Sequence, residues 1–347
     1  MSAKDGRATL ATVAASAGVS VATVSKVING RADVAPETRA LVEAVLRRHD
    51  YVRRRPAPAR TTTATPRIEV IFAGDLNAYS LEVIQGLLDS AAELRVALGV
   101  SIRARAHRRP QVFGAWVRDL AAAGREAVIM ITDDLKSSDL GALARARLPL
   151  VVIDPLQQPH SRVTSVGSTN FAGGLAATRH LLSLGHRRIA HVGGPATAAC
   201  NQARQHGFRA AMEAAGIAVP DAYLRSGQYR FVDGLTSGSA LLDLPQPPTA
   251  VFAGSDETAA GVVEAARMRG MRIPEDLSLV GFDDTQVARH ASPPLTTVRQ
   301  PLREIAAVAL RTALRLAAGE KLDSYHVELA TELIVRQSTA RLDPPGP

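Results

Sequence analysis

The 347-residue sequence has a single cysteine, Cys200, and no uninterrupted apolar run near the roughly 18 residues that a membrane-spanning helix needs. One cysteine cannot build a disulfide framework, and it excludes zinc or iron–sulfur sites made of clustered cysteines. The N-terminal residues also lack the apolar core of a secretory signal. These absences predict a soluble, cytoplasmic protein that makes no contact with a membrane.

Motifs of common enzymes are absent as well. The sequence has no GxxxxGK[ST] phosphate loop, no GxGxxG after an apolar strand and no G-x-S-x-G nucleophile elbow. His180, His186 and His191 lie close in sequence but lack a metal-ligand spacing such as HExxH. We therefore expect a protein that is not an enzyme and that needs neither a metal ion nor another cofactor.

Positive charge is concentrated at the N-terminus. Residues 1–65 hold eleven lysines and arginines and five acids, a net charge of +6, and the other 282 residues bring the whole chain only to +8. A basic head on a nearly neutral body favours a polyanionic partner for the head. A run of charge is more often a solvated surface, so charge alone does not decide the function.

The hydrophobic pattern divides the chain. Helical spacing of apolar residues near 10–17, 21–28 and 36–48 predicts three short helices, and the stretch RRPAPARTTTATP at 54–66 has the composition of a linker. The part beyond the linker has a different pattern. The predicted divisions are an all-α head at residues 1–52, a linker or hinge at 53–66, and a second domain at 67–347.

Beyond Pro66, short apolar runs alternate with amphipathic helical stretches. This order is typical of parallel strands with helices on both faces, and about 280 residues suffice for two such α/β lobes. The predicted strands are 68–74, 127–131, 150–154, 189–194, 249–254 and 277–283. The predicted helices lie near 81–95, 114–123, 139–147, 173–184, 203–215, 232–242, 257–269 and 303–318.

Residues 8–30, ATLATVAASAGVSVATVSKVING, contain a helix, a turn at Gly18 and a second helix that Ser20 can cap. The small residues Ala14 and Ala17 allow the close crossing of a helix-turn-helix motif. An ordinary helical hairpin has the same spacing. The basic excess, the hydroxyl residues and the linker favour a DNA-binding head instead.

This segment closely resembles the DNA-binding headpiece of the LacI/GalR family of transcriptional regulators, through TLxxVAxxAGVSxxTVSxVxN and the following VAPETRALVEAVLRRHDYV. The resemblance implies that Val21, Ala22 and Lys26 read bases in the major groove, the first two by apolar contacts and the lysine by a hydrogen bond to guanine. A buried helix position is the alternative for Val21. The positions that match contacts to the DNA backbone are Thr9, Ser20, Thr23, Ser25 and Asn29.

The hinge departs from the family's pattern. Family members typically have a short hinge helix with a leucine that enters the minor groove, whereas Pro56 and Pro58 disfavour a helix here and Arg60 stands in place of the leucine. Arginines can instead hold phosphates or enter a narrow minor groove. The sequence leaves open whether the hinge becomes helical on DNA. The hinge residues that we expect on the DNA backbone are Arg53, Arg54, Arg55 and Arg60.

Four aspartates, Asp75, Asp154, Asp256 and Asp283, each follow a predicted strand directly. Open parallel sheets bind ligands beyond the carboxyl ends of their strands, so four carboxylates in this position predict a shared polar cleft. A single aspartate there is more often a helix cap, and Asp256 in SDETAAG could be one.

The second domain resembles the periplasmic-binding-protein-like sensor core of the same family, through GSTNFAGGLAATRHLLSLGHRRIAHVGG, AVFAGSDETAAG, IPEDLSLVGFDD and PPLTTVRQP. Carboxylates and a guanidinium suit paired sugar hydroxyls, and an aromatic face suits the apolar side of a sugar ring. A helix-surface arginine is the alternative for Arg204. The positions that the resemblance places in or beside the effector pocket are Asp154, Arg204, Tyr229, Asp256, Asp283 and Gln300, with Asp75 and Ser255 as weaker candidates.

Taken together, these inferences predict a repressor that binds a pseudo-palindromic double-stranded DNA operator as a homodimer or tetramer. A small sugar or oligosaccharide effector between the lobes would control it by shifting its conformational populations. A nucleobase effector is the alternative within this class. Two alternatives lie outside the regulator class. One is a sugar-modifying protein with a DNA-binding head, which would need the missing catalytic motifs, and the other is a sugar-binding protein for uptake.

Overall fold

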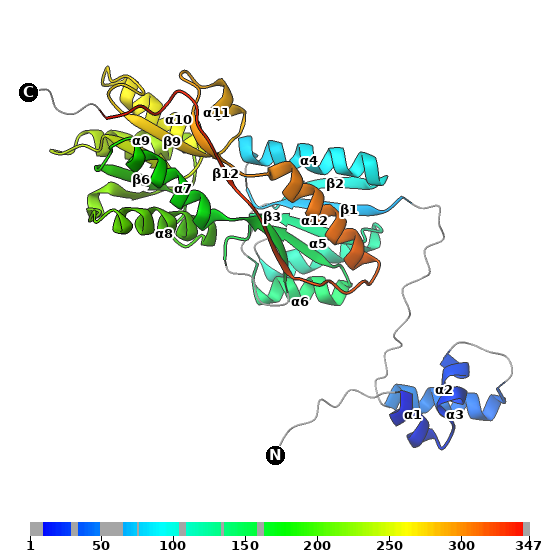
Figure 1. Cartoon of the computed structure of the whole chain (residues 1–347). Helices are drawn as coiled ribbons and strands as arrows, with labels where there is room; N and C mark the ends of the chain where they lie inside the picture. The colour runs from blue at the N-terminus through cyan, green and yellow to red at the C-terminus, as the bar shows by residue number, and fades with distance from the viewer. Residues whose placement is uncertain are drawn as a thin grey trace, which may run out of the picture. The chain divides into compact units, whose positions relative to one another are not determined.

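In the computed structural model the described residues are 10–28, 34–48, 65–74, 76–103, 109–132, 135–157 and 163–342. The chain divides into two units, Met1–Ala64 and Thr65–Pro347 (Figure 1). The described part of the first unit is helical and the second unit is α/β, which confirms the predicted fold class. Of the predicted linker at 53–66, only residues 65 and 66 are among those described.

The described residues of the first unit form three short helices: α1 (Leu10–Ala17), α2 (Val21–Ile28) and α3 (Pro36–Arg48). Their apolar faces pack into a small core that includes Val13, Val24 and Val42, each fully buried. Gly18 turns the chain between α1 and α2 with a φ of +63°, a conformation that glycine adopts without steric cost. Ser20 then caps α2, because its Oγ accepts a hydrogen bond from the backbone N–H of Thr23 at 3.1 Å.

The described residues of the second unit form two six-stranded sheets, which define an N-lobe and a C-lobe. The N-lobe sheet has the order β11-β5-β4-β3-β1-β2, and the C-lobe sheet has the order β12-β10-β9-β8-β6-β7. All neighbouring strands are parallel except for β12, which is antiparallel to β10. The N-lobe strands are β1 (Arg67–Phe72), β2 (Ala97–Ile102), β3 (Ala127–Ile131), β4 (Leu150–Ile153), β5 (Thr164–Ser168) and β11 (His326–Leu329). The C-lobe strands are β6 (Ile189–Gly193), β7 (Leu224–Ser226), β8 (Ala250–Ala253), β9 (Ser278–Asp283), β10 (Thr296–Arg299) and β12 (Glu332–Ile334).

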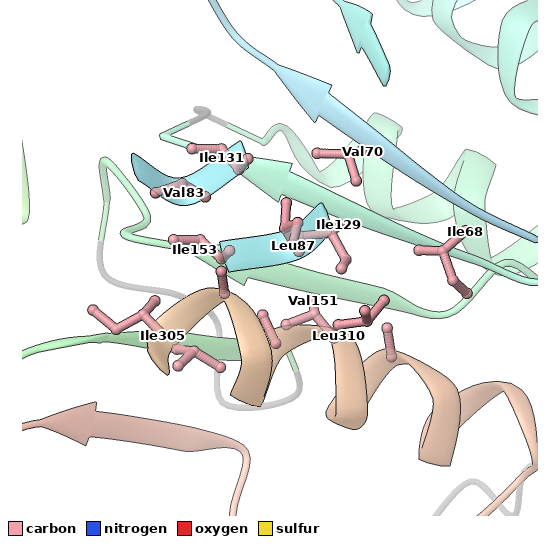
Figure 2. Packing of buried hydrophobic residues seen from close by; sticks show 14 of the residues in the cluster. Ile68, Val70, Val83, Leu87, Ile129, Ile131, Val151, Ile153, Ile305 and Leu310 are labelled. Carbon is pink, nitrogen blue, oxygen red and sulfur yellow. The ribbon is translucent and has the colours of Figure 1, made fainter. Parts of the chain in front are cut away.

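Helices cover both faces of each sheet. In the N-lobe, α4 (Ala78–Leu94) and α12 (Leu302–Ala317) pack side chains such as Leu87 and Ile305 against β1, β3 and β4 (Figure 2). The opposite face is covered by α5 (Pro110–Ala122) and α6 (Ser137–Ala146). The C-lobe helices are α7 (Asn170–Ser183), α8 (Ala199–Ala214), α9 (Phe231–Leu242), α10 (Asp256–Arg267) and the short α11 (Gln286–His290). All six predicted strands and all eight helices predicted beyond the linker are present.

Within residues 163–342, all of which are described, the chain passes between the lobes three times: from β5 to α7, from β10 to α12 and from β11 to β12. Hydrogen bonds tie these crossings together. Ser168 Oγ donates to Gln300 Oε1 at 2.5 Å, and the backbone N–H of Thr331 donates to Thr169 Oγ1 at 3.0 Å. The three crossings therefore form one hydrogen-bonded hinge.

His191 lies in the middle of β6, fully buried between the rings of Phe208 and Phe252. Burial lowers its pKa to about 4, from an ordinary value of 6.5. Between these two pH values the unfolded chain binds a proton that the folded chain does not, so His191 makes stability rise with pH. We expect His191→Gln to remove about 2.4 kcal/mol of this pH dependence, measured as the free energy of urea unfolding at pH 4.5 to 7. An unchanged slope would show that folding does not shift the pKa of His191.

Candidate functional site

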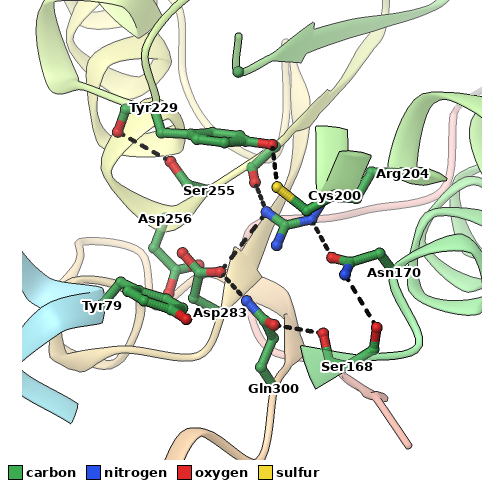
Figure 3. Close-up of polar contacts among 12 residues, drawn as sticks. Tyr79, Ser168, Asn170, Cys200, Arg204, Tyr229, Ser255, Asp256, Asp283 and Gln300 are labelled. Carbon is green, nitrogen blue, oxygen red and sulfur yellow. Dashed lines mark hydrogen bonds and ion pairs between the residues drawn. The ribbon is translucent and has the colours of Figure 1, made fainter. Parts of the chain in front are cut away.

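A cavity of about 260 Å³ lies between the lobes, at the carboxyl ends of both sheets (Figure 3). We call it the inner cavity. This is the place where open parallel sheets bind ligands. The N-lobe lines it with Asn77, Tyr79, Thr132 and Asp154, among others. The C-lobe lines it with Cys200, Arg204, Gln228, Tyr229, Ser255, Glu257, Asp283 and Thr285, among others.

Arg204, on α8, is the central cation of the inner cavity and is only 4% exposed. Its Nε donates to Asn170 Oδ1 at 2.8 Å, and its Nη1 donates to the backbone oxygen of Gly254 at 2.5 Å. The guanidinium also lies 3.8 Å from the centre of the Phe282 ring. The alternative of a helix-surface arginine is therefore wrong, because Arg204 is fixed in the cavity wall.

Asp283 ends β9 and faces Arg204, with 3.9 Å between its Oδ1 and Arg204 Nη1. Gln300 Nε2 donates to the same Oδ1 at 2.7 Å, and Gln300 also accepts the Ser168 hydrogen bond in the hinge. Burial raises the pKa of Asp283 well above its usual range, and the charge of Arg204 opposes this rise. Gln300 does not line the inner cavity itself, but it connects Asp283 to the hinge.

Asp154 follows β4 and brings a carboxylate from the N-lobe. Tyr79, in the first turn of α4, donates its hydroxyl proton to Asp154 Oδ2 at 2.5 Å. Burial raises the pKa of Asp154, whereas the hydrogen bond from Tyr79 and the charge of Arg204 lower it. Tyr79 is not among the site residues predicted from the sequence, although its position shortly after the end of β1 could have indicated it.

Tyr229 supplies the aromatic face. Its ring lies directly over Gly194 and next to Gly254, and a Cβ at Gly194 would be 2.1 Å from the ring. Only glycine at position 194 leaves room for the tyrosine. Ser255 Oγ donates to the backbone oxygen of Tyr229 at 3.3 Å and accepts from Thr258 N at 3.1 Å, so Ser255 is the N-cap of α10.

Asp256 has a different environment from the other two described strand-end aspartates. It is the first residue of α10 and not its cap, and its carboxylate accepts hydrogen bonds from Thr285 N, Thr285 Oγ1 and Thr297 Oγ1 at 2.6 to 3.0 Å. It therefore borders the inner cavity without lining it, and it joins α10 to β10 and to the segment after β9. The predicted residue Asp75 lies outside the described residues.

Strained backbone collects around the inner cavity. Of the seven described non-glycine residues with positive φ, Arg95 and Arg147 are helix C-caps. The other five lie at the cavity or beside it, where strained conformations commonly accompany a functional role. They are Thr132, Asp154, Tyr229, Asp283 and Asp284.

Direct contacts join the lobes across the cleft. The backbone N–H of Ala78 in the N-lobe donates to Glu257 Oε1 of the C-lobe at 3.0 Å. Arg289 Nη2, on α11 of the C-lobe, donates to Glu82 Oε1 on α4 at 2.6 Å. Burial acts to raise the pKa of Glu82, but the hydrogen bonds from Arg289 and Arg303 lower it overall. These contacts connect the two lobes across the cleft.

In the head, the predicted base-reading residues lie on the outer side of α2. Val21 is 47% exposed, and Ala22 and Lys26 are also exposed, whereas Val24 and Val27 are buried. The alternative of a buried Val21 is therefore wrong. Ser20 is exposed, and Thr23 and Ser25 are partly buried. The other predicted DNA contacts lie outside the described residues: Thr9, Asn29, Arg53, Arg54, Arg55 and Arg60.

Within the described part of the chain, no helix is long and apolar enough to cross a membrane. Among the same residues, no three His, Cys, Asp or Glu side chains are grouped so that they could hold a metal ion.

Comparisons with known proteins agree with both units. Residues 9–54 match the bacterial regulatory proteins of the lacI family, and residues 178–339 match the periplasmic binding protein-like domain. The HTH-type transcriptional regulator DegA of Bacillus subtilis is 32% identical, covering 97% of this chain and 99% of DegA. The HTH-type transcriptional regulator CelR of Thermobifida fusca is 32% identical, covering 96% of this chain and 98% of CelR.

Solved structures lead to the same assignment. A CelR–cellobiose complex has a TM-score of 0.72 at 30% identity, covering 96% of this chain and all of that one. The lac repressor dimer bound to operator and an anti-inducer has a TM-score of 0.70 at 25% identity, covering 96% of this chain and 99% of the repressor chain. With relatives above 30% identity along almost its whole length, the chain belongs to the LacI family and is a DNA-binding transcriptional regulator rather than an enzyme.

Proposed function

We propose that this regulator is a repressor that binds a pseudo-palindromic operator as a homodimer and is controlled by a sugar in the inner cavity. One observation carries the effector assignment: Arg204, Asp154, Asp283 and the ring of Tyr229 meet in one buried cavity between the lobes. Because its target is operator DNA, the protein would act in the cytoplasm, at the nucleoid.

The chemistry of the inner cavity supports a sugar. Two carboxylates can accept hydrogen bonds from hydroxyl groups, and the guanidinium of Arg204 can donate to neighbouring oxygens. The Tyr229 ring offers a face to the apolar side of a pyranose or furanose. The cellobiose complex of the similar protein CelR supports the same effector class.

For the head, we propose that α2 enters the major groove. Val21 and Ala22 would contact apolar groups such as thymine methyls, and Lys26 would hydrogen-bond guanine. Ser20, Thr23 and Ser25 would contact phosphates from the same helix and its cap, and Thr9 and Asn29 would flank them. The arginines of the hinge would add phosphate contacts.

An exposed apolar surface in the N-lobe supports a homodimer. Leu81 and Leu88 of α4 and Val100 and Ile102 of the edge strand β2 are each 49 to 50% exposed. An open edge strand with exposed apolar residues is a natural pairing surface. We expect Leu88→Glu to shift the protein from dimer to monomer in sedimentation at micromolar concentration, whereas Met268→Glu, at an exposed position in the C-lobe, should leave the dimer intact.

Selection of genomic fragments by the purified protein at near-physiological salt tests the DNA assignment. We expect a palindrome with two major-groove half-sites. Random fragments that are lost as salt rises would contradict an operator-specific regulator. A panel of sugars and nucleobases, titrated into the protein–operator complex, then tests the effector. Release or tightening of DNA by a nucleobase alone would overturn the sugar assignment.

The Glu82–Arg289 ion pair should slow the release of the effector. Arg289 is partly exposed, so the pair contributes about 1 kcal/mol, and we expect Arg289→Ala to speed effector dissociation about fivefold in stopped-flow measurements. Arg267→Ala is the control, because it removes an ion pair of similar kind, Arg267 with Glu264, that lies within α10 and does not join the lobes. Equal dissociation rates for the wild type, Arg289→Ala and Arg267→Ala would show that the Glu82–Arg289 pair does not hold the lobes together.

A further inference from the structure

A second cavity of about 550 Å³ adjoins the inner cavity, and we call it the outer cavity. Its walls come from β5 and β11 of the N-lobe and from the first turns of α7 and α8 of the C-lobe. Asp154 and Cys200 line both cavities, so the two spaces share part of their walls. Neither the family resemblance nor the site residues described above assign a role to the outer cavity.

The outer cavity has an aromatic wall. Phe171, the second residue of α7, lines it and is 47% exposed, although the helix has buried positions one turn further on. A single exposed phenylalanine is ordinary on a protein surface. This one, however, lies on the wall of a cavity that polar side chains such as Ser165, Asn170 and Glu328 also line.

Hydrogen-bonding groups accompany the ring. Glu328 and His326 of β11 line the outer cavity and are exposed, and the imidazole Nδ1 of His326 lies 3.0 Å from Ser165 Oγ. Asp154 adds a second carboxylate from the wall that the two cavities share. An aromatic face beside carboxylates is the same combination that suits a sugar ring in the inner cavity.

We propose that the outer cavity receives the second ring of an oligosaccharide effector whose first ring occupies the inner cavity. This inference rests on the proposed sugar effector. The inner cavity alone lies just below the usual range of ligand sites, about 300 to 1,000 Å³, so it suits one ring. The glycosidic bond passes between Asp154 and Cys200, and Phe171 stacks against the second ring while Glu328 accepts from its hydroxyls.

Calorimetry of the full-length protein with matched sugar pairs tests this inference. The probes are glucose with cellobiose and with maltose, galactose with lactose, and xylose with xylobiose. We expect at least one disaccharide to bind tenfold or more tightly than its monosaccharide. Phe171→Ala should lower the affinity for that disaccharide about tenfold, because it removes one stacking contact and its buried area. The affinity for the monosaccharide should stay unchanged.

Phe231→Ala is the matched control. Phe231 begins α9, is 45% exposed and lines neither cavity, so both affinities should stay at the wild-type value. Glu328→Ala gives a second, independent variant and should also weaken only the disaccharide. Thermal melts of each variant check that the fold is retained.

The outcomes separate the two proposals. If disaccharides bind no more tightly than monosaccharides, or if Phe171→Ala weakens neither or both equally, the second-ring site is wrong and the sugar effector stands. If no sugar of the panel binds, the proposed sugar effector falls, and the second-ring site falls with it.

Discussion

Arg204→Ala is expected to lower effector affinity about a hundredfold or more while effector-free binding to the operator stays at its wild-type value. The buried guanidinium is held by Asn170 and Gly254 and faces Asp283, so it is oriented before the ligand arrives. Removing one partner of a desolvated charged contact costs about 2 to 5 kcal/mol, and each 1.4 kcal/mol is a tenfold change in affinity. Calorimetry with the effector measures the effector affinity. Operator-binding assays with and without the effector measure the affinity for DNA and its response.

Two further variants make this prediction specific. Arg209→Ala removes an exposed arginine from the same helix and should change neither quantity. Arg204→Lys keeps the charge but loses the planar pair of donors, so it should recover only part of the affinity. Loss of operator binding in Arg204→Ala, with a lower melting temperature, would instead mark Arg204 as a residue that holds the C-lobe together.

Replacing Arg53, Arg54 and Arg55 together with alanine is expected to weaken binding to every DNA sequence and to flatten its salt dependence. Six phosphate contacts per dimer would reduce the slope of log affinity against log salt by about five. Between 50 and 200 mM salt, the wild-type affinity should then fall about a thousandfold more than that of the variant. Fluorescence anisotropy with an operator duplex and a scrambled duplex gives both slopes.

Lys26→Ala should behave differently. A lysine that hydrogen-bonds guanine contributes to the choice of base, so its loss should relax the preference at one position of each half-site by about 1 to 3 kcal/mol. The hinge variant should keep the wild-type base preference. An unchanged preference in Lys26→Ala would remove Lys26 from base reading, and a wild-type salt slope in the triple variant would remove these arginines from the phosphates.

The strands that sequence reasoning found are those with continuous apolar runs, such as β1 and β3, whose side chains are almost all buried. The strands β5 and β10 were not predicted, because their sequences, TSVGS and TTVR, consist largely of polar residues. Hydroxyl side chains of both strands are nevertheless buried and form hydrogen bonds with residues that are distant in sequence. Ser168 bonds Gln300, and Thr297 bonds Asp256. A local pattern carries no information about such partners.

The same limit applies to the site. The rule that ligands lie beyond strand ends brought Asp154 and Asp283 to one cavity, since both follow strands of the facing sheets. It could not distinguish Asp256, which also follows a strand end but turns toward threonines of β10 and of the segment after β9. Tyr79 was missed because its role depends on how the first turn of α4 meets the end of β4.

The order in which a ribosome makes the chain has a consequence for the N-lobe. Its sheet begins at residue 67, but α12, which supplies Ile305 and Leu310 to the core of that lobe, is among the last helices to be made (Figure 1). The N-lobe therefore cannot complete its core until most of the C-lobe has been synthesised. A nascent chain that stops after β10 would leave unfinished the lobe that was started first, so a late truncation would damage the earlier half of the second unit.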